Sequence, residues 1–154
     1  MYREQSLRVR DMAQTGIFTA LTAMGAFISI PIGPVPITLQ SFFVLLSGFI
    51  LGSKKAMYSQ ITYLLLGLIG FPIFAGFTGG LQSLFKPSFG FIIGYIAAAY
   101  AVGKLTEAKP ASLIGLWTAV LTGTIIIYAF GLPYMYYVLN IMLSSNLSLL
   151  RIQQ

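Results

Sequence analysis

Four long stretches of this sequence contain no charged residue, and they limit what the chain can fold into. They cover residues 12–53, 56–85, 87–103 and 110–150. A helix needs about 20 mostly apolar residues to cross the roughly 30 Å hydrocarbon core of a bilayer. Charged residues make up 8% of the chain, whereas soluble domains usually carry about 25% because their water-facing surface needs them. The sequence therefore predicts a membrane protein.

Prolines and glycines divide these stretches into five predicted helices. Proline removes a backbone donor and disfavours helix in the residue before it, so the proline-containing segments 31–37 and 71–87 are predicted to be loops. Thr38 is predicted to be the N-cap of the second helix, and Gly131-Leu132-Pro133 is predicted to end the fifth. The fold class is thus all-α, a polytopic transmembrane bundle that forms a single membrane domain over residues 1–154, with spans at about 12–30, 38–51, 55–69, 88–103 and 111–130 and an incomplete C-terminal region at 131–154.

The basic residues predict the orientation of this bundle. Seven of the nine lie in residues 1–11, 54–55 and 104–109, which share one side of the membrane in an alternating layout. Cytoplasmic segments carry an excess of Lys and Arg. Residues 1–11 are therefore predicted to be cytoplasmic, and the loops at 31–37 and 71–87 and the C-terminus are predicted to face outward.

The missing residue types exclude much chemistry. The chain has no Cys and no His, so a thiolate nucleophile, an imidazole base or the usual zinc ligands are not available. Its three acidic residues are Glu4, Asp11 and Glu107, all in or beside charged, loop-like stretches. Gly103-Lys104-Leu105 lacks the other residues of a phosphate-binding loop. We expect no enzyme activity, no catalytic residue, no metal site and no cofactor, and the net charge of +6 indicates topology rather than a nucleic-acid partner.

The two outward loops are unusually apolar and rich in glycine. Irregular backbone is tolerated at membrane depth where protein covers it or where it lines a cavity, and glycine lets the backbone approach a ligand closely. One interpretation is an outward-facing pocket for a small, partly apolar molecule. The other is a pair of compact connectors between tightly packed helices.

Three segments in and around these loops resemble the BioY family, the substrate-binding S components of energy-coupling-factor (ECF) biotin transporters. They are Val35-Pro36-Ile37-Thr38-Leu39-Gln40, residues 67–76 (GLIGFPIFAG) and Gly79-Gly80-Leu81. The match in order and spacing covers about residues 12–143. The resemblance implies a six-helix protein of the bacterial plasma membrane that captures biotin from outside. It also implies a transmembrane coupling protein and ATPase subunits as partners.

Two departures from the family pattern stand out. The family typically has Gly-Pro-Thr-Gly-Gly-Tyr where this chain has Lys86-Pro87-Ser88-Phe89-Gly90-Phe91. The family also closes with a sixth helix whose Pro-Gly-Asp-x-x-Lys motif supplies an acid and a lysine to the biotin site, and no Asp or Lys follows Lys109 here. On this basis we expect weak biotin binding or none. The alternatives to a biotin-binding subunit are a truncated, non-binding remnant of one and an S component for a different vitamin.

The resemblance and the residue chemistry together select candidate site residues. Lys86 could hold the carboxylate of biotin, although a lysine there could equally snorkel to lipid headgroups. Thr38 and Gln40 suit the ureido ring, or serve as a cap and an interhelical hydrogen bond. Aromatic residues Phe74, Phe77 and Tyr95 could line the apolar part. The complete substrate-binding prediction is Thr38, Gln40, Phe74, Gly79, Gly80, Lys86 and Tyr95.

The first predicted helix carries small residues four positions apart, which allow close helix approach in lipid. In the resembled family, small residues there dock onto the coupling protein. That role is carried to Gly16, Ala20 and Ala23, with packing inside the bundle as the alternative.

Overall fold

The structure is a computed structural model that describes residues 2–30, 32, 37–108 and 112–152. Five α-helices make up most of this part, together with one pair of two-residue strands and one 3-10 helix. The elements are α1 (Tyr2–Phe27), β1 (Ser29–Ile30), β2 (Ile37–Thr38), α2 (Gln40–Leu51), α3 (Ser53–Ile69), η1 (Leu81–Phe85), α4 (Phe89–Ala108) and α5 (Leu113–Ile152). The predicted all-α class with five helices is confirmed.

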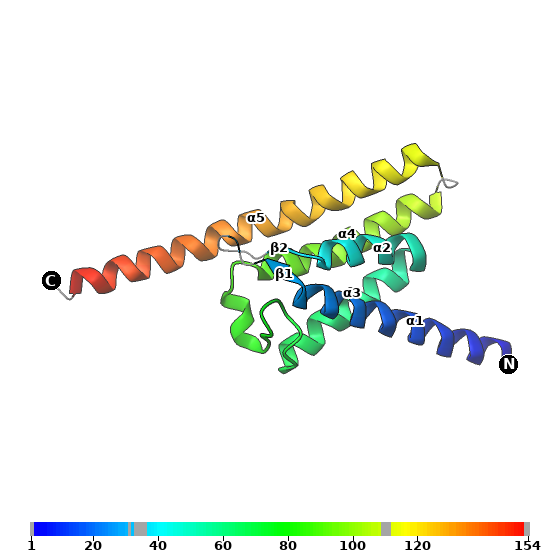
Figure 1. Cartoon of the computed structure of the whole chain (residues 1–154), viewed down its shortest axis with the longest axis horizontal. Helices are drawn as coiled ribbons and strands as arrows, with labels where there is room; N and C mark the ends of the chain where they lie inside the picture. The colour runs from blue at the N-terminus through cyan, green and yellow to red at the C-terminus, as the bar shows by residue number, and fades with distance from the viewer. Residues whose placement is uncertain (1, 31, 33–36, 109–111, 153–154) are drawn as a thin grey trace.

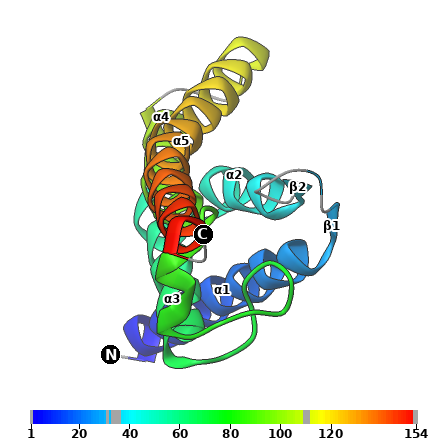
Figure 2. The same ribbon diagram turned by 90° about the vertical axis from the view of Figure 1, so that its left-hand side faces the viewer.

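Helix α4 lies at the centre of the bundle. It packs against α2, α3 and α5, while α1 packs against α2 and α3. Figure 1 shows α5 running alongside α4, with the red end of α5 and the blue end of α1 extending from opposite ends of the molecule. The view along the bundle in Figure 2 places α4 and α5 together on one side and α1 on the other, with α2 between them.

Two helices of the described part are long and apolar enough to cross a membrane. They cover Phe89–Glu107 in α4 and Leu113–Ile141 in α5, with mean hydropathies of 1.4 and 1.9. Only 17% of the α5 segment is buried inside the protein, against 56% for α4. A long apolar helix that the protein leaves uncovered is suited to lipid.

The end of the bundle that holds the α2–α3 turn is tightly packed. A Cβ at Gly48 would lie 2.7 Å from Val102 Cγ1, and a Cβ at Gly103 would overlap the backbone of Ser53. The Glu107 carboxylate accepts hydrogen bonds from the Ser53 N–H at 2.8 Å and from the Ser53 hydroxyl at 3.1 Å. Because this N–H belongs to the first turn of α3, where helix donors lack an internal partner, Glu107 joins the end of α4 to the start of α3.

Polar contacts join α1 to α3. Lys55 Nζ lies 2.6 Å from an Asp11 carboxylate oxygen. The Thr19 hydroxyl donates to the Ser59 carbonyl at 2.9 Å, and Gln60 Nε2 donates to the Thr22 hydroxyl at 3.2 Å. Buried hydrogen bonds of this kind hold helices together when both the protein interior and the surrounding lipid are apolar.

Both predicted bounds of the first helix and the predicted N-cap of the second are wrong. The first helix was predicted at 12–30, but α1 begins at Tyr2 and ends at Phe27, because the charged N-terminal segment contains no helix breaker and Ser29 and Ile30 pair with Thr38 and Ile37. Residues 31 and 33–36 of the predicted first loop lie outside the described residues. Thr38 is not the N-cap of α2, since Leu39 holds that position.

The predicted end of the fifth helix near Phe130 is also wrong, because α5 continues through Gly131 and Pro133. A proline costs the helix one hydrogen bond, which is tolerated where neighbouring elements hold the segment. Gly131 lies directly against the ring of Phe91, and Tyr134 against Gly90. The Tyr134 hydroxyl also donates to the Leu84 carbonyl. These contacts to α4 and η1 keep the helix continuous past the proline.

Candidate binding site

A cavity of about 470 Å³ lies between the start of α2, the segment after α3, and helices α4 and α5. Small-molecule sites commonly measure ~300–1,000 Å³ and combine apolar walls with a few polar groups. This cavity has both kinds of wall. Its lining residues are Ile37, Thr38, Gln40, Ser41, Phe74, Ala75, Thr78, Ser83, Lys86, Ser88, Phe89, Phe91, Ile92, Tyr95, Ile127, Tyr128, Leu132 and Met135.

The polar wall is built where β2 leads into α2. The Thr38 hydroxyl accepts the backbone N–H of Gln40 and donates to Gln40 Oε1, both at 3.3 Å. Gln40 is 3% exposed, and its Nε2 donates to the Tyr63 hydroxyl at 2.5 Å. The Tyr63 hydroxyl in turn donates to the Ile73 carbonyl at 2.8 Å. A buried amide with this network presents hydrogen-bonding groups that are already oriented.

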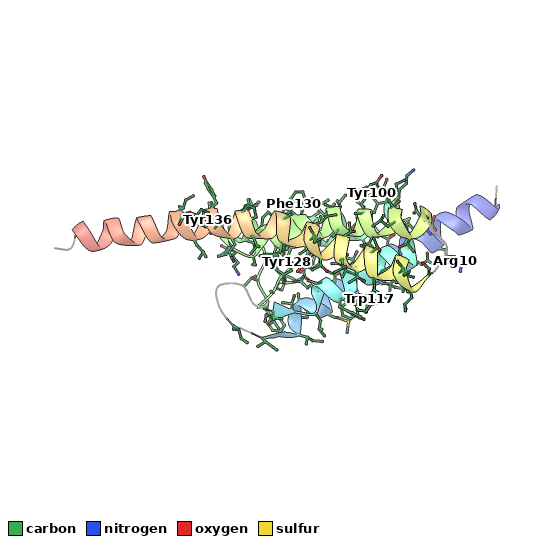
Figure 3. All side chains as sticks on the ribbon, turned by 90° about the horizontal axis from the view of Figure 1, so that it is seen from above. Arg10, Tyr100, Trp117, Tyr128, Phe130 and Tyr136 are labelled. Carbon is green, nitrogen blue, oxygen red and sulfur yellow. The ribbon has the colours of Figure 1, made fainter. Side chains whose placement is uncertain are left out.

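The apolar wall comes from aromatic side chains on three elements. Phe74 is buried and meets the edge of the Tyr63 ring, with centroids 5.5 Å apart. Tyr95 is buried on α4, with its hydroxyl near those of Ser41 and Thr38. Tyr128 on α5 packs edge-on against Phe91 at 5.8 Å. In Figure 3, Tyr128 lies on the side of α5 that faces α2, whereas Phe130 lies on the opposite side.

Lys86 supplies the positive charge of the cavity. It follows η1, its backbone N–H donates to the Ser83 carbonyl at 3.1 Å, and its side chain is half-buried in the cavity lining. Partial desolvation holds the pKa of the ammonium below its ordinary value. Among the described residues, no carboxylate lies within 4.0 Å of it. An anion in the cavity would supply the missing counter-charge.

Gly79 and Gly80 do not line the cavity, and their positions indicate a role in loop geometry. A Cβ at Gly79 would overlap the Phe71 carbonyl. Gly80 has a φ of +89°, which L-residues rarely adopt, and its N–H donates to the Gly67 carbonyl at 2.6 Å. These contacts fold the segment after α3 back onto the end of that helix, which places Phe74 and Thr78 in the cavity wall.

The third aromatic candidate, Phe77, lies outside the cavity. It is 67% exposed, and its ring stacks on Phe27 at the end of α1 with centroids 4.6 Å apart. Five of the seven predicted binding residues line the cavity, namely Thr38, Gln40, Phe74, Lys86 and Tyr95.

The predicted docking residues of α1 do not share one environment. Gly16 and Ala20 are exposed, and nothing lies within 4 Å of a Cβ built at Gly16. They lie among exposed apolar side chains that include Ile17 and Met24. Ala23 is partly buried and packs against the core, so it belongs to the inside of the bundle.

Sequence reasoning missed Ser41, Ser83, Tyr63 and the α5 wall of the cavity. Ser83 is 2% exposed, and its hydroxyl has no hydrogen-bond partner in the described part of the chain. Tyr63 could have been found from helical spacing, because it shares the buried face of α3 with Ala56, Gln60 and Gly67. The part of the cavity wall that α5 provides could not have been found in this way, because the sequence predicted that this helix ends near Phe130.

Comparison with known proteins gives consistent matches. The BioY family model matches residues 2–152. The "Biotin transporter BioY" of Thermotoga maritima is 48% identical over 123 residues, which cover 80% of this chain and 72% of that protein. The "Probable biotin transporter BioY" of Lysinibacillus sphaericus is 38% identical over 149 residues, 96% of this chain and 74% of that protein.

A solved structure matches the fold as well. It is the crystal structure of the S-component for biotin from an ECF-type ABC transporter, with a TM-score of 0.79 and 30% sequence identity. The match covers 88% of this chain and 76% of that chain.

Proposed function

The chain belongs to the BioY family, and we propose that it is the biotin-binding membrane subunit of a vitamin-uptake transporter. The observation that carries the proposal is the 470 Å³ cavity, which combines the buried amide of Gln40 with the uncompensated ammonium of Lys86. Biotin has a ureido group with two N–H donors and one carbonyl acceptor, an apolar thioether ring and a carboxylate tail. Each part has a chemical counterpart in this cavity.

The ureido group is assigned to the polar wall. Gln40 Oε1 and the hydroxyl oxygens of Thr38 and Tyr95 offer acceptors for its N–H groups, and the Tyr95 hydroxyl can also donate to its carbonyl. The apolar ring packs against Phe74 and Tyr95, and the carboxylate pairs with Lys86. Gly79 and Gly80 support the binding segment without lining the cavity.

Isothermal titration of the purified chain with biotin tests this function directly. In place of the weak binding or none expected from the sequence alone, we expect saturable binding of biotin, because the cavity offers a counterpart to each part of the ligand. Its alcohol analogue biotinol, which keeps the ureido group but lacks the carboxylate, should bind more weakly. If biotin produces no heat at protein concentrations of about 100 μM, any dissociation constant lies above the millimolar range, where binding is worth only about 4 kcal/mol. That result would contradict the proposal.

Membership of the BioY family also supports a proposal about partners. We propose that the chain assembles with a transmembrane coupling protein and ATPase subunits of an ECF transporter, and that α1 forms the contact through Gly16 and Ala20. Both positions are exposed on one face of α1, and small side chains allow a second helix to approach closely.

We expect Ala20→Trp to reduce co-purification with the coupling protein by roughly tenfold, because a bulky residue at a close helix contact costs about 1–3 kcal/mol and each 1.4 kcal/mol is tenfold. Thr118→Trp is the matched control, since Thr118 is exposed on α5. Biotin titration of both variants checks that the cavity is intact. Equal recovery of the coupling protein with both variants would exclude α1 as the contact.

We further propose that the chain spans the bacterial plasma membrane with its N-terminus in the cytoplasm and the cavity open to the outside. The absence of native cysteine allows single-cysteine labelling. Both test positions are exposed: Lys54 lies in the first turn of α3, and Gln82 lies in η1, at the cavity end of the bundle. Gln82→Cys should react with a membrane-impermeant maleimide in intact cells, and Lys54→Cys only after permeabilisation. The reverse labelling pattern would invert the topology.

A further inference from the structure

Tyr63 occupies the junction between three elements behind the polar wall of the cavity. Its side chain is completely buried on α3. Its hydroxyl contacts Gln40 Nε2 on α2 at 2.5 Å and the Ile73 carbonyl in the segment after α3 at 2.8 Å. Tyr63 itself does not line the cavity, so it acts on a ligand only through the residues it contacts.

The hydrogen-bond rules of these groups determine which way the Gln40 amide faces. A tyrosine hydroxyl has one proton, and a carbonyl oxygen can only accept. The Tyr63 proton is therefore committed to the Ile73 carbonyl. Toward Gln40 the hydroxyl oxygen can then only accept, which requires the NH₂ group of the amide to face Tyr63. The reversed amide would place two acceptor oxygens against each other with no proton between them.

This orientation has a consequence on the cavity side. With Nε2 held by Tyr63, Gln40 Oε1 lies on the side of Thr38, whose hydroxyl donates to it at 3.3 Å. A carbonyl oxygen has two lone pairs, so one remains for a donor in the cavity. We propose that Tyr63 is a positioning residue that sets Gln40 as a hydrogen-bond acceptor, and so selects ligands with an N–H donor at this wall. The inference rests on the proposed function, in which that donor belongs to the ureido group.

Tyr63→Phe tests the hydroxyl alone. The substitution keeps the ring and its edge contact with Phe74 while removing the acceptor for Nε2 and the donor to Ile73. We expect biotin affinity to fall about tenfold, because the Gln40 amide is no longer held in one orientation. Tyr58→Phe is the matched control on the same helix, since Tyr58 is 53% exposed, and it should leave biotin affinity unchanged.

A double-mutant cycle separates positioning from a general loss of structure. Gln40→Met removes the amide at similar side-chain length, and the cycle measures whether the two residues act through each other. If Tyr63 acts through Gln40, Tyr63→Phe has no further effect on biotin affinity in the Gln40→Met background. Additive losses in the double variant would overturn the proposal.

A second measurement does not depend on biotin. In chain labelled with ¹⁵N-glutamine, the side-chain NH₂ resonances of Gln40 are assigned by their loss in Gln40→Met. We expect Tyr63→Phe to move one of these proton resonances upfield, as a lost hydrogen bond does, and Tyr58→Phe to leave both in place. Unmoved resonances in Tyr63→Phe would overturn the proposal. Moved resonances in a chain that does not bind biotin would refute the proposed function and leave the orientation of the Gln40 amide by Tyr63 standing.

Discussion

Gly79→Val is expected to lower biotin affinity by at least 100-fold, although Gly79 does not line the cavity. A Cβ at this position would overlap the Phe71 carbonyl and lie 3.2 Å from the Gly67 carbonyl, and backbone atoms cannot turn aside as a flexible side chain does. The segment from Phe71 to Gly80 would have to leave its place against α3. Phe74 and Thr78 would then leave the cavity wall.

Titration calorimetry with biotin measures the effect. Gly16→Val is the matched control, because nothing lies within 4 Å of a Cβ at Gly16, and we expect it to bind biotin as the unaltered chain does. Thermal unfolding of Gly79→Val should show that the bundle still folds, since the close packing at the α2–α3 turn does not involve this segment. Unaltered biotin affinity in Gly79→Val would refute the structural role assigned to the glycine.

Lys86→Glu is expected to have a comparable effect for an electrostatic reason. A hydrogen bond to a charged partner contributes about 1.5–3 kcal/mol, so removing it costs roughly 10- to 150-fold in affinity, and the reversed charge adds repulsion. We therefore expect biotin affinity to fall by about 100-fold or more in Lys86→Glu. The loss should be smaller in Lys86→Gln, which has no charge at this position. Affinity for biotinol should change little in either variant.

The pH dependence of binding follows from the same residue. Burial lowers the pKa of the Lys86 ammonium, so the free chain loses this charge at a lower pH than an ordinary lysine would. A bound carboxylate favours the charged form and raises the pKa again. Biotin affinity should therefore fall as the pH rises through the pKa of Lys86 in the free chain, and Lys86→Arg should remove that fall. Equal loss of biotin and biotinol binding in Lys86→Glu would contradict the assignment of the carboxylate.

The sequence predicted the parts of the structure that depend on local patterns. Long charge-free stretches interrupted by proline predicted five helices, and five are present in the described residues. Gln40 lines the cavity because it opens α2, Thr38 because it lies in β2 just before that helix, and Lys86 because it directly follows η1. Each of these positions is fixed by its place relative to a helix end.

Other features depend on contacts between distant segments and were not accessible from the sequence. Pro133 indicated a helix end, but its neighbours pack against Phe91 and Gly90 on α4, and this tertiary packing prevailed over the local preference. Gly79 was assigned to the ligand because glycine allows close approach, whereas what approaches it is the Phe71 carbonyl of the same segment.

The opposite ends of the bundle are built differently. At the α2–α3 turn, Gly48 and Gly103 bring α4 into direct contact with its neighbours, and Glu107 ties α4 to Ser53. At the cavity, the wall is completed by an irregular segment that is anchored in the core by the buried Phe74 and joined to α1 by the stack of Phe77 on Phe27. Closely packed interiors resist deformation, so we expect the end with the α2–α3 turn to be stiffer than the end with the cavity. In the proposed function, we expect entry and release of the ligand to displace this segment while the helices keep their spacing, and the stack of Phe77 on Phe27 links the segment to the end of α1.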